Sequence, residues 1–275
     1  MRKTGFIGFG RMGSIMLKAL LDAGALSQEQ VIVFTRTPEK LQDFREKYQK
    51  VEIAKSLAEL APQCGRIFIC TGTAEVKGVL HELLRYMPGD VHLITITGTI
   101  EIECLETMFT GRISKIIPTQ IAEVGEGVTL VCHNHKVLPK DREFIHDTFG
   151  KIGQVKEMKE SQLGLADELS GCAPAFYAAI LNNFAEAVKK HGDLTSAEIK
   201  EIMIVTFYGT AKLFIDRKVG FTELITRVAT PGGITGEGVR IMDRELPAMF
   251  DEMLTATMNK REKIKRRMRE QYGLE

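Results

Sequence analysis

Two glycine-rich segments carry the residues whose types and spacing could do chemistry. Residues 8–13 read Gly-Phe-Gly-Arg-Met-Gly, and residues 229–235 read Ala-Thr-Pro-Gly-Gly-Ile-Thr. Glycines at the start of a helix leave backbone N–H groups exposed, and such a helix terminus binds small anions. We therefore expect a pyrophosphate at the first segment and a small anion at the second.

The first segment follows an apolar strand and opens a helix. In this pattern Gly8 permits a tight turn, Gly10 lets the backbone approach a pyrophosphate, and Gly13 lets the helix pack against the sheet. The segment lies within a strand–helix–strand unit that ends at Thr35. Because that context is the one a dinucleotide fingerprint requires, the segment predicts a dinucleotide site rather than a structural turn.

The end of the second expected strand indicates which dinucleotide binds. NAD enzymes usually place an acidic residue there to hold the ribose hydroxyls, whereas this chain has Thr35, Arg36 and Thr37. A guanidinium flanked by hydroxyls offers charged hydrogen bonds to the 2′-phosphate of NADP(H). We expect NADP(H) as the cofactor, with NAD(H) as the alternative. The other interpretation of Arg36 is a solvated side chain in the loop before Pro38.

The elements that must position these residues alternate between strands and helices, which predicts a doubly wound parallel sheet. Strands are expected at residues 4–8, 31–35, 51–54, 66–71, 92–97 and 115–118, and helices at 13–23, 37–48, 56–61, 73–86 and 100–109. Two further strands, at 127–132 and 153–156, flank a helix at 140–149.

Beyond residue 158 the character of the chain changes. Long amphipathic stretches cover 161–191, 196–217 and 246–271, at the spacing typical of helices. We expect an α/β fold in which a Rossmann-like dinucleotide-binding domain (1–158) precedes an all-helical C-terminal domain (159–275). The stretches carry more apolar surface than one small helical layer can hide, so this domain is expected to form a homodimer or a higher homo-oligomer.

Composition excludes several classes of partner. With 37 basic and 36 acidic residues the formal net charge is +1, which gives no bias toward nucleic acid or an anionic membrane. No apolar run approaches the roughly 20 residues of a membrane span, and the first strand leaves no room for a signal peptide. Five widely spaced cysteines without a C-x-x-C pair suit reduced thiols, so we expect a cytoplasmic protein.

Two other segments could be mistaken for functional sites. Residues 132–135 read Cys-His-Asn-His, but no matching ligand pair exists elsewhere, so we expect a solvated loop and no metal. Residues 259–275 contain seven basic and three acidic side chains. A solvated helical face explains them without a nucleic-acid partner, because aromatic residues are absent before Tyr272.

Together, the motifs resemble the pyrroline-5-carboxylate reductase family over almost the whole chain. Besides both glycine segments, the resemblance rests on Gly125-Glu126-Gly127-Val128, on Leu169-Ser170-Gly171-Cys172-Ala173-Pro174-Ala175, and on Gly209-Thr210-Ala211-Lys212-Leu213. It implies an NAD(P)H-dependent reductase that converts 1-pyrroline-5-carboxylate, a cyclic imino acid, into L-proline. It also implies a helical C-terminal domain that interlocks with a second copy.

The resemblance also implies residue roles. Thr235 is expected to face the imine nitrogen as a catalytic residue, and Glu160 to favour the cationic imine. The substrate-binding residues would be Thr230, Gly232, Gly233 and Ile234. The cofactor-binding residues would be Gly8, Phe9, Gly10, Arg11, Met12, Gly13, Thr35, Arg36, Thr37, Cys70, Thr71, Gly72, Thr95, Ile96 and Thr97.

A second interpretation stays open, because the chain departs from the family pattern around the expected nicotinamide. Residues 70–73 read Cys-Thr-Gly-Thr where the family usually has Ala-Val-Lys-Pro, and residues 96–98 read Ile-Thr-Gly where paired alanines precede the glycine. Residues 235–238 also resemble a branch known from bacterial competence operons. The alternative is a divergent paralog that binds NADP(H) but acts on another imine or has a regulatory role.

Overall fold

The computed structural model describes residues 2–274, which divide into two compact units. The first unit contains the residues up to Pro174 together with those from Met258 onward, and the second contains Ala175–Thr257. The last strand ends at Glu157, close to the predicted change of character. The boundary at 158/159 stays a prediction about the two domains.

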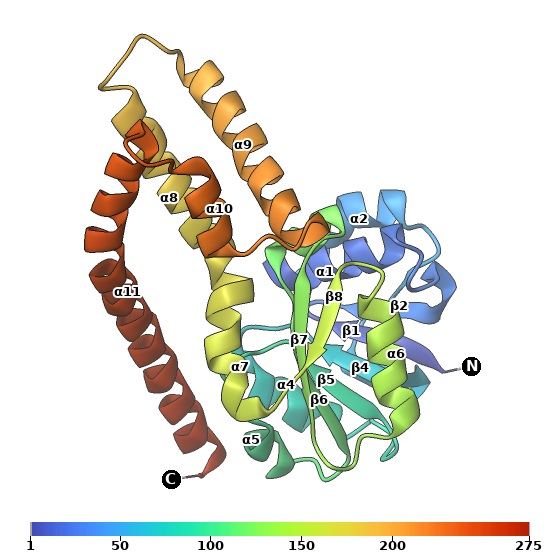
Figure 1. The fold of residues 1–275 in the computed structure, drawn as a ribbon. Helices are drawn as coiled ribbons and strands as arrows, with labels where there is room; N and C mark the ends of the chain where they lie inside the picture. Colours follow the sequence, from blue (N-terminus) through green and yellow to red (C-terminus); the bar gives the residue numbers. More distant parts are fainter. Residues whose placement is uncertain (1, 275) are drawn as a thin grey trace. The chain divides into compact units, whose positions relative to one another are not determined.

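Eight strands form one sheet in the first unit (Figure 1). Their bounds are β1 Lys3–Ile7, β2 Val31–Phe34, β3 Glu52–Ile53, β4 Cys64–Ile69, β5 His92–Thr95, β6 Arg112–Ile117, β7 Val128–His133 and β8 Gln154–Glu157. The strand order is β3-β2-β1-β4-β5-β6-β7-β8. The ends of β1, β2, β4 and β5 therefore meet at one edge, where ligands of open α/β sheets bind.

One pairing departs from the predicted parallel sheet. β6 and β7 are antiparallel, and β8 is parallel to β7, so these last two strands run against the other six. Parallel neighbours need a long crossover, usually through a helix. Residues 118–127 contain only a 3-10 turn, η5 Gln120–Val124, and therefore return the chain as an antiparallel neighbour.

Helices cover both faces of the sheet. Successive strand residues point to opposite sides, and both sets are apolar, so each face buries its side chains against helices. Phe6 belongs to one buried cluster and Ile7 to the other. The Phe6 face is covered by α1 Arg11–Asp22, α2 Gln42–Lys47 and α6 Pro139–Phe149. The Ile7 face is covered by α3 Leu57–Leu60, α4 Val76–Leu83, α5 Ile102–Glu106 and α7 Glu160–Asp167, with Met268 and Tyr272 from the chain end. The α/β fold class is confirmed.

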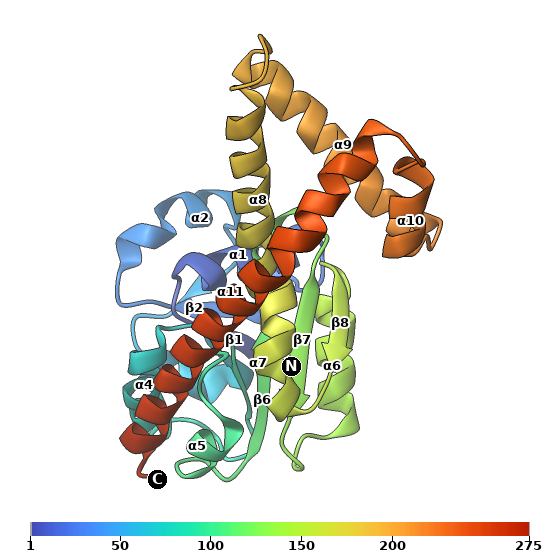
Figure 2. The same cartoon turned by 60° about the vertical axis from the view of Figure 1, so that its left-hand side comes forward.

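The second unit is helical. Its elements are α8 Ala173–Val188, α9 Ser196–Asp216, α10 Phe221–Val228 and the first part of α11 Ile234–Tyr272. α8 and α9 form a hairpin (Figure 2) in which the rings of Tyr177 and Phe207 lie 6.0 Å apart. Large apolar side chains remain on the surface of this unit, among them Phe184 and Ile215 at 61% and 71% exposure. Such a surface fits burial against another chain.

The amphipathic stretch predicted at 161–191 forms one helical run from α7 through α8, with a π-helical turn at Glu168–Cys172 between them. Pro174 has no N–H to donate, and Gly171 lowers helix propensity. The stretch predicted at 246–271 belongs to α11, which begins at Ile234, where the second glycine segment predicts a helix start. No helix within residues 2–274 combines the length and apolar character needed to cross a bilayer.

Candidate functional site

The turn after β1 has a backbone that only glycine accepts easily. Gly8 has a φ of +97°, and its N–H donates to the Phe34 carbonyl at 2.8 Å. A Cβ added at Gly8 would lie 2.9 Å from the carbonyl carbon and oxygen of Cys70. The first glycine therefore joins the ends of β1, β2 and β4 in one tight arrangement.

The other two glycines of the motif differ in their surroundings: Gly10 lies in an open position and Gly13 in a packed one. Apart from Gly10 itself and its two chain neighbours, no atom of the described residues lies within 4 Å of a Cβ built at Gly10, whereas one built at Gly13 would lie 2.9 Å from the Gly8 oxygen. The backbone at Gly10 is thus free for close approach by a ligand, and Gly13 lets α1 pack beside the turn. The first turn of α1 contains no acidic residue, so its exposed amides fit a pyrophosphate.

A cavity of about 200 Å³ lies at this sheet edge. It brings together nine of the predicted cofactor residues: Gly8, Phe9, Gly10, Thr35, Arg36, Thr37, Cys70, Thr71 and Gly72. Arg11, Met12 and Gly13 lie outside its lining, on the first turn of α1. Burial raises the pKa of the Cys70 thiol, so this cysteine offers the cavity a neutral wall.

Four charged side chains also line the cavity. Arg36 forms an ion pair with Glu75, which lies in the 3-10 turn η4 Thr73–Glu75. Lys40 and Glu82 complete the set. Arg36 was predicted from the sequence but the two carboxylates were not, because Glu75, for example, is 39 residues away along the chain.

Three more predicted cofactor residues lie at the end of β5 and just after it, outside the lining of the cavity. The Thr95 hydroxyl accepts from the Thr97 N–H at 3.2 Å, and the Ile96 N–H donates to the Ile69 carbonyl at 3.3 Å. Thr95 and Thr97 are buried. These bonds hold the loop after β5 against the end of β4.

A buried ion pair supports the next residues of the same loop. Lys115 in β6 is 1% exposed, and its Nζ lies 2.7 Å from Glu160 Oε1, 2.8 Å from the Ile100 oxygen and 3.4 Å from the Gly98 oxygen. Glu160 Oε1 also accepts from the Ile102 N–H at 2.9 Å. The structure therefore brings Glu160 to the loop after β5, and Lys115 is a neighbour that sequence analysis missed.

A second ion cluster lies on the other side of Gly98. Arg261 donates to Asp167 Oδ2 at 2.8 Å and to Glu168 Oε1 at 2.9 Å. A Cβ added at Gly98 would lie 3.7 Å from Arg261 Nη1. Burial raises the pKa of Asp167, although the Arg261 hydrogen bond and charge oppose this. The loop around Gly98 is therefore in contact with two charged clusters, one centred on Lys115 and one on Arg261.

The predicted substrate residues lie in the second unit. Gly232 has a φ of +75°, and the Gly233 N–H donates to the Thr230 carbonyl at 2.9 Å. This turn delivers the chain into α11 at Ile234, which is 92% exposed. Thr235 follows on the first helical turn, also exposed. The turn and the helix start together offer free N–H groups to an anion.

The expected solvated loop at residues 132–135 is wrong in part. Cys132 and His133 belong to β7; Cys132 is buried and the side chain of His133 is 1% exposed, because β7 lies between β6 and β8. Ser114 Oγ lies 2.6 Å from His133 Nδ1 and 2.6 Å from His92 Nε2. Burial lowers the pKa of both histidines. Within residues 2–274 no three His, Cys, Asp or Glu side chains come together at metal-binding spacing.

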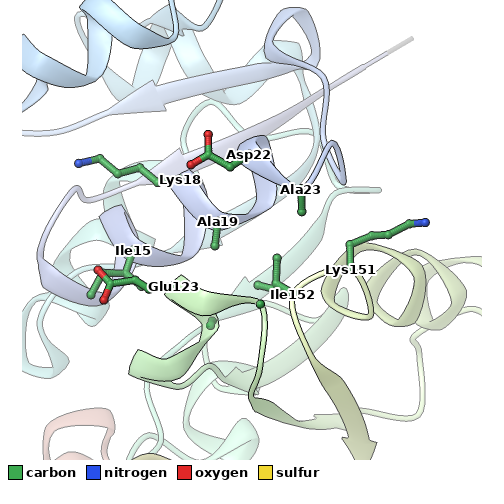
Figure 3. Close-up of a pocket in the computed structure, with 10 residues that line it drawn as sticks. Ile15, Lys18, Ala19, Asp22, Ala23, Glu123, Lys151 and Ile152 are labelled. Atoms are coloured by element: carbon green, nitrogen blue, oxygen red, sulfur yellow. The ribbon is translucent and has the colours of Figure 1, made fainter. Parts of the chain in front are cut away.

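A separate groove of about 310 Å³ lies between α1 and the turn η5 (Figure 3). Its middle contains Ala19 and Ile152, and Lys18 and Lys151 extend away from it in opposite directions. Asp22 in its lining already bonds to Lys47 and Tyr48. The groove therefore presents no converging charged groups comparable with those of the cofactor cavity.

Comparisons with known proteins give consistent matches. Residues 160–264 match the family model for pyrroline-5-carboxylate reductase dimerisation, and residues 3–98 match that for NADP oxidoreductase, coenzyme F420-dependent. The chain is 31% identical to pyrroline-5-carboxylate reductase 3 of Bacillus subtilis, over 95% of this chain and 96% of that relative. It is 25% identical to ComE operon protein 4 of the same organism, over 94% and 95%. The crystal structure of Plasmodium falciparum pyrroline carboxylate reductase with NADP bound matches with a TM-score of 0.82 and 25% identity, over 96% and 97% of the two chains.

Proposed function

The chain belongs to the pyrroline-5-carboxylate reductase family, and from this premise we propose that it reduces 1-pyrroline-5-carboxylate to L-proline with NADPH. The similarity to a reductase over 95% of the chain carries the proposal. The cofactor cavity supports it, because the Gly8–Gly10 turn admits a pyrophosphate and Arg36 supplies a cation for a 2′-phosphate. Bound NADPH supplies the hydride that reduces the imine carbon.

The protein's own part in the reaction is positioning. A protonated cyclic imine is already electrophilic, so the chain has mainly to bind the carboxylate and orient the ring. We assign the carboxylate to the amides of Gly232, Gly233 and Ile234, with Thr230 shaping the turn. The Thr235 hydroxyl oxygen then accepts a hydrogen bond from the protonated imine nitrogen. Glu160 already bonds to Lys115 and to the Ile102 N–H. We therefore assign it the role of holding the loop after β5 rather than of contacting the substrate.

We also propose a cytoplasmic homodimer. All five cysteines are unpaired, as expected of a protein in a reducing compartment. The apolar surface of α8–α11 and the match to a dimerisation model support assembly of two copies.

A second candidate follows from the likeness to ComE operon protein 4. In that case the chain would bind NADP(H) without reducing pyrroline-5-carboxylate. One experiment separates the two: the loss of NADPH absorbance with pyrroline-5-carboxylate as the only acceptor. Turnover supports the reductase, and tight NADPH binding without turnover supports the second candidate.

Variants then test the substrate site. Thr235→Ala removes the hydroxyl that hydrogen-bonds to the reacting imine, so kcat/KM should fall by a factor equivalent to about 2 to 4 kcal/mol of transition-state stabilisation while the NADPH affinity stays unchanged. Thr222→Ala, an exposed position on α10, is the matched control and should retain parental activity. Equal activity of the Thr235 variant and the parent would refute the assignment.

A further inference from the structure

The cofactor cavity contains a carboxylate that the usual strand position lacks. In NAD-binding folds the acid that holds the ribose hydroxyls ends the second strand, and here that position is occupied by Thr35, Arg36 and Thr37. Glu75 instead enters the same cavity from the turn after β4. An acidic group from the turn after a neighbouring strand therefore lies beside Arg36 in this cavity.

Two contacts fix the Glu75 carboxylate. One oxygen pairs with Arg36, and the other accepts from the Gly72 N–H at 3.2 Å. The backbone contact anchors Glu75 from its own turn, so Arg36 is the partner free to leave. The Arg36 side chain is 71% exposed and that of Glu75 is 40% exposed, so little rearrangement of the core accompanies an exchange.

The charges of the cavity balance. Arg36 and Lys40 oppose Glu75 and Glu82, which gives two minus two, or no net charge. A 2′-phosphate must therefore compete with Glu75 for Arg36 and approach a fixed carboxylate. A ribose 2′-hydroxyl meets no such opposition, because a carboxylate accepts its hydrogen bond.

We propose that Glu75 is a cofactor-specificity residue that restrains the preference for NADP(H). Its carboxylate holds Arg36 in the free protein and accepts the ribose 2′-hydroxyl of NAD(H). NADP(H) binds by drawing Arg36 from Glu75 to the 2′-phosphate, with Lys40 beside it. This proposal rests on the cofactor part of the proposed function and does not require turnover.

The test is Glu75→Gln, measured by nicotinamide fluorescence titration of NADPH and NADH without substrate. Glutamine retains an oxygen for the Gly72 N–H but loses the charge. NADPH should bind about three- to tenfold more tightly, as expected for removing a competing exposed charge, and NADH should bind more weakly. In an Arg36→Gln background the gain in NADPH affinity should shrink, while the loss in NADH affinity should persist.

Glu39→Gln is the control for net charge, because Glu39 is exposed nearby but does not line the cavity. Thermal melting of each variant reports on folding. The proposal is overturned if Glu75→Gln leaves the ratio of the two dissociation constants within twofold of the parent, or if Glu39→Gln shifts it equally. Failure of the parent to reduce pyrroline-5-carboxylate would sink the proposed function and leave this ratio untouched.

Discussion

Replacing Lys115 with methionine should destabilise the first unit strongly. Methionine keeps the length and apolar stem of the side chain but removes the ammonium that lies 2.7 Å from Glu160 and 2.8 Å from the Ile100 oxygen. The substitution leaves a carboxylate and a carbonyl without their charged donor in a site where the lysine is 1% exposed.

The magnitude follows from the burial of each partner. Removing one member of a fully buried ion pair costs about 3 to 5 kcal/mol. The Glu160 side chain is 30% exposed, so water recovers part of that cost, and we expect a loss of about 2 to 4 kcal/mol. The loop after β5 should also become mobile, which should weaken NADPH binding.

Urea unfolding measures the stability, and Lys55→Met, at an exposed position, controls for removal of a lysine. A double-mutant cycle with Glu160→Gln should give a coupling energy of at least about 1 kcal/mol for groups in direct contact. If Lys115→Met unfolds within about 0.5 kcal/mol of the parent, as surface substitutions usually do, the buried pair does not hold this loop.

Three further outcomes are expected. Gly8→Ala places a Cβ 2.9 Å from the Cys70 carbonyl at a φ of +97°, so it should cost about 1 to 3 kcal/mol and weaken NADPH binding; Gly78→Ala, with open space around it, should cost nothing in the same urea titration. The buried histidines 92 and 133 have a pKa lowered below 6.5, so the unfolded chain binds more protons and stability falls as pH drops below that value. Between pH 7 and pH 5 the two histidines together should remove stability on the order of 2 kcal/mol, and His133→Gln should flatten this dependence, whereas a variant with an unchanged slope would contradict it. Light scattering at micromolar concentration should give at least twice the 30.7 kDa chain mass, and a stable folded monomer would refute the dimer.

Local patterns made the cofactor turn and the fold class predictable. The spacing of Gly8, Gly10 and Gly13 encodes a turn that a few consecutive residues define, and alternating apolar runs mark strands covered by helices. Contacts between distant segments left no such pattern. Lys115 and Glu160 are 45 positions apart in the sequence (160 minus 115), and neither residue type by itself predicts a buried ion pair.

Polar residues also misled the interpretation in one place. His133 was expected in a solvated loop because the predicted strand ended at Cys132, yet it is the last residue of β7, which lies between two other strands, and its ring bonds to Ser114. The antiparallel direction of β7 was also not predicted, because strand propensity does not indicate the direction of a strand. The short connection between β6 and β7 did contain this information, since parallel neighbours need a longer one. Burial of polar groups depends on partners that the sequence places far away.

The last turns of α11 complete the hydrophobic core of the first unit, which is built mainly from residues before position 174. Met268 and Tyr272 belong to the buried cluster on the Ile7 face of the sheet, and Arg269 pairs with Glu101 and Glu103. Domains generally fold from the N-terminal side, but these core residues follow the whole second unit, Ala175–Thr257, in the sequence. The nucleotide-binding unit therefore cannot complete its core until the second unit has been synthesised, and a nascent chain that stops before residue 258 lacks part of the cover on the Ile7 face.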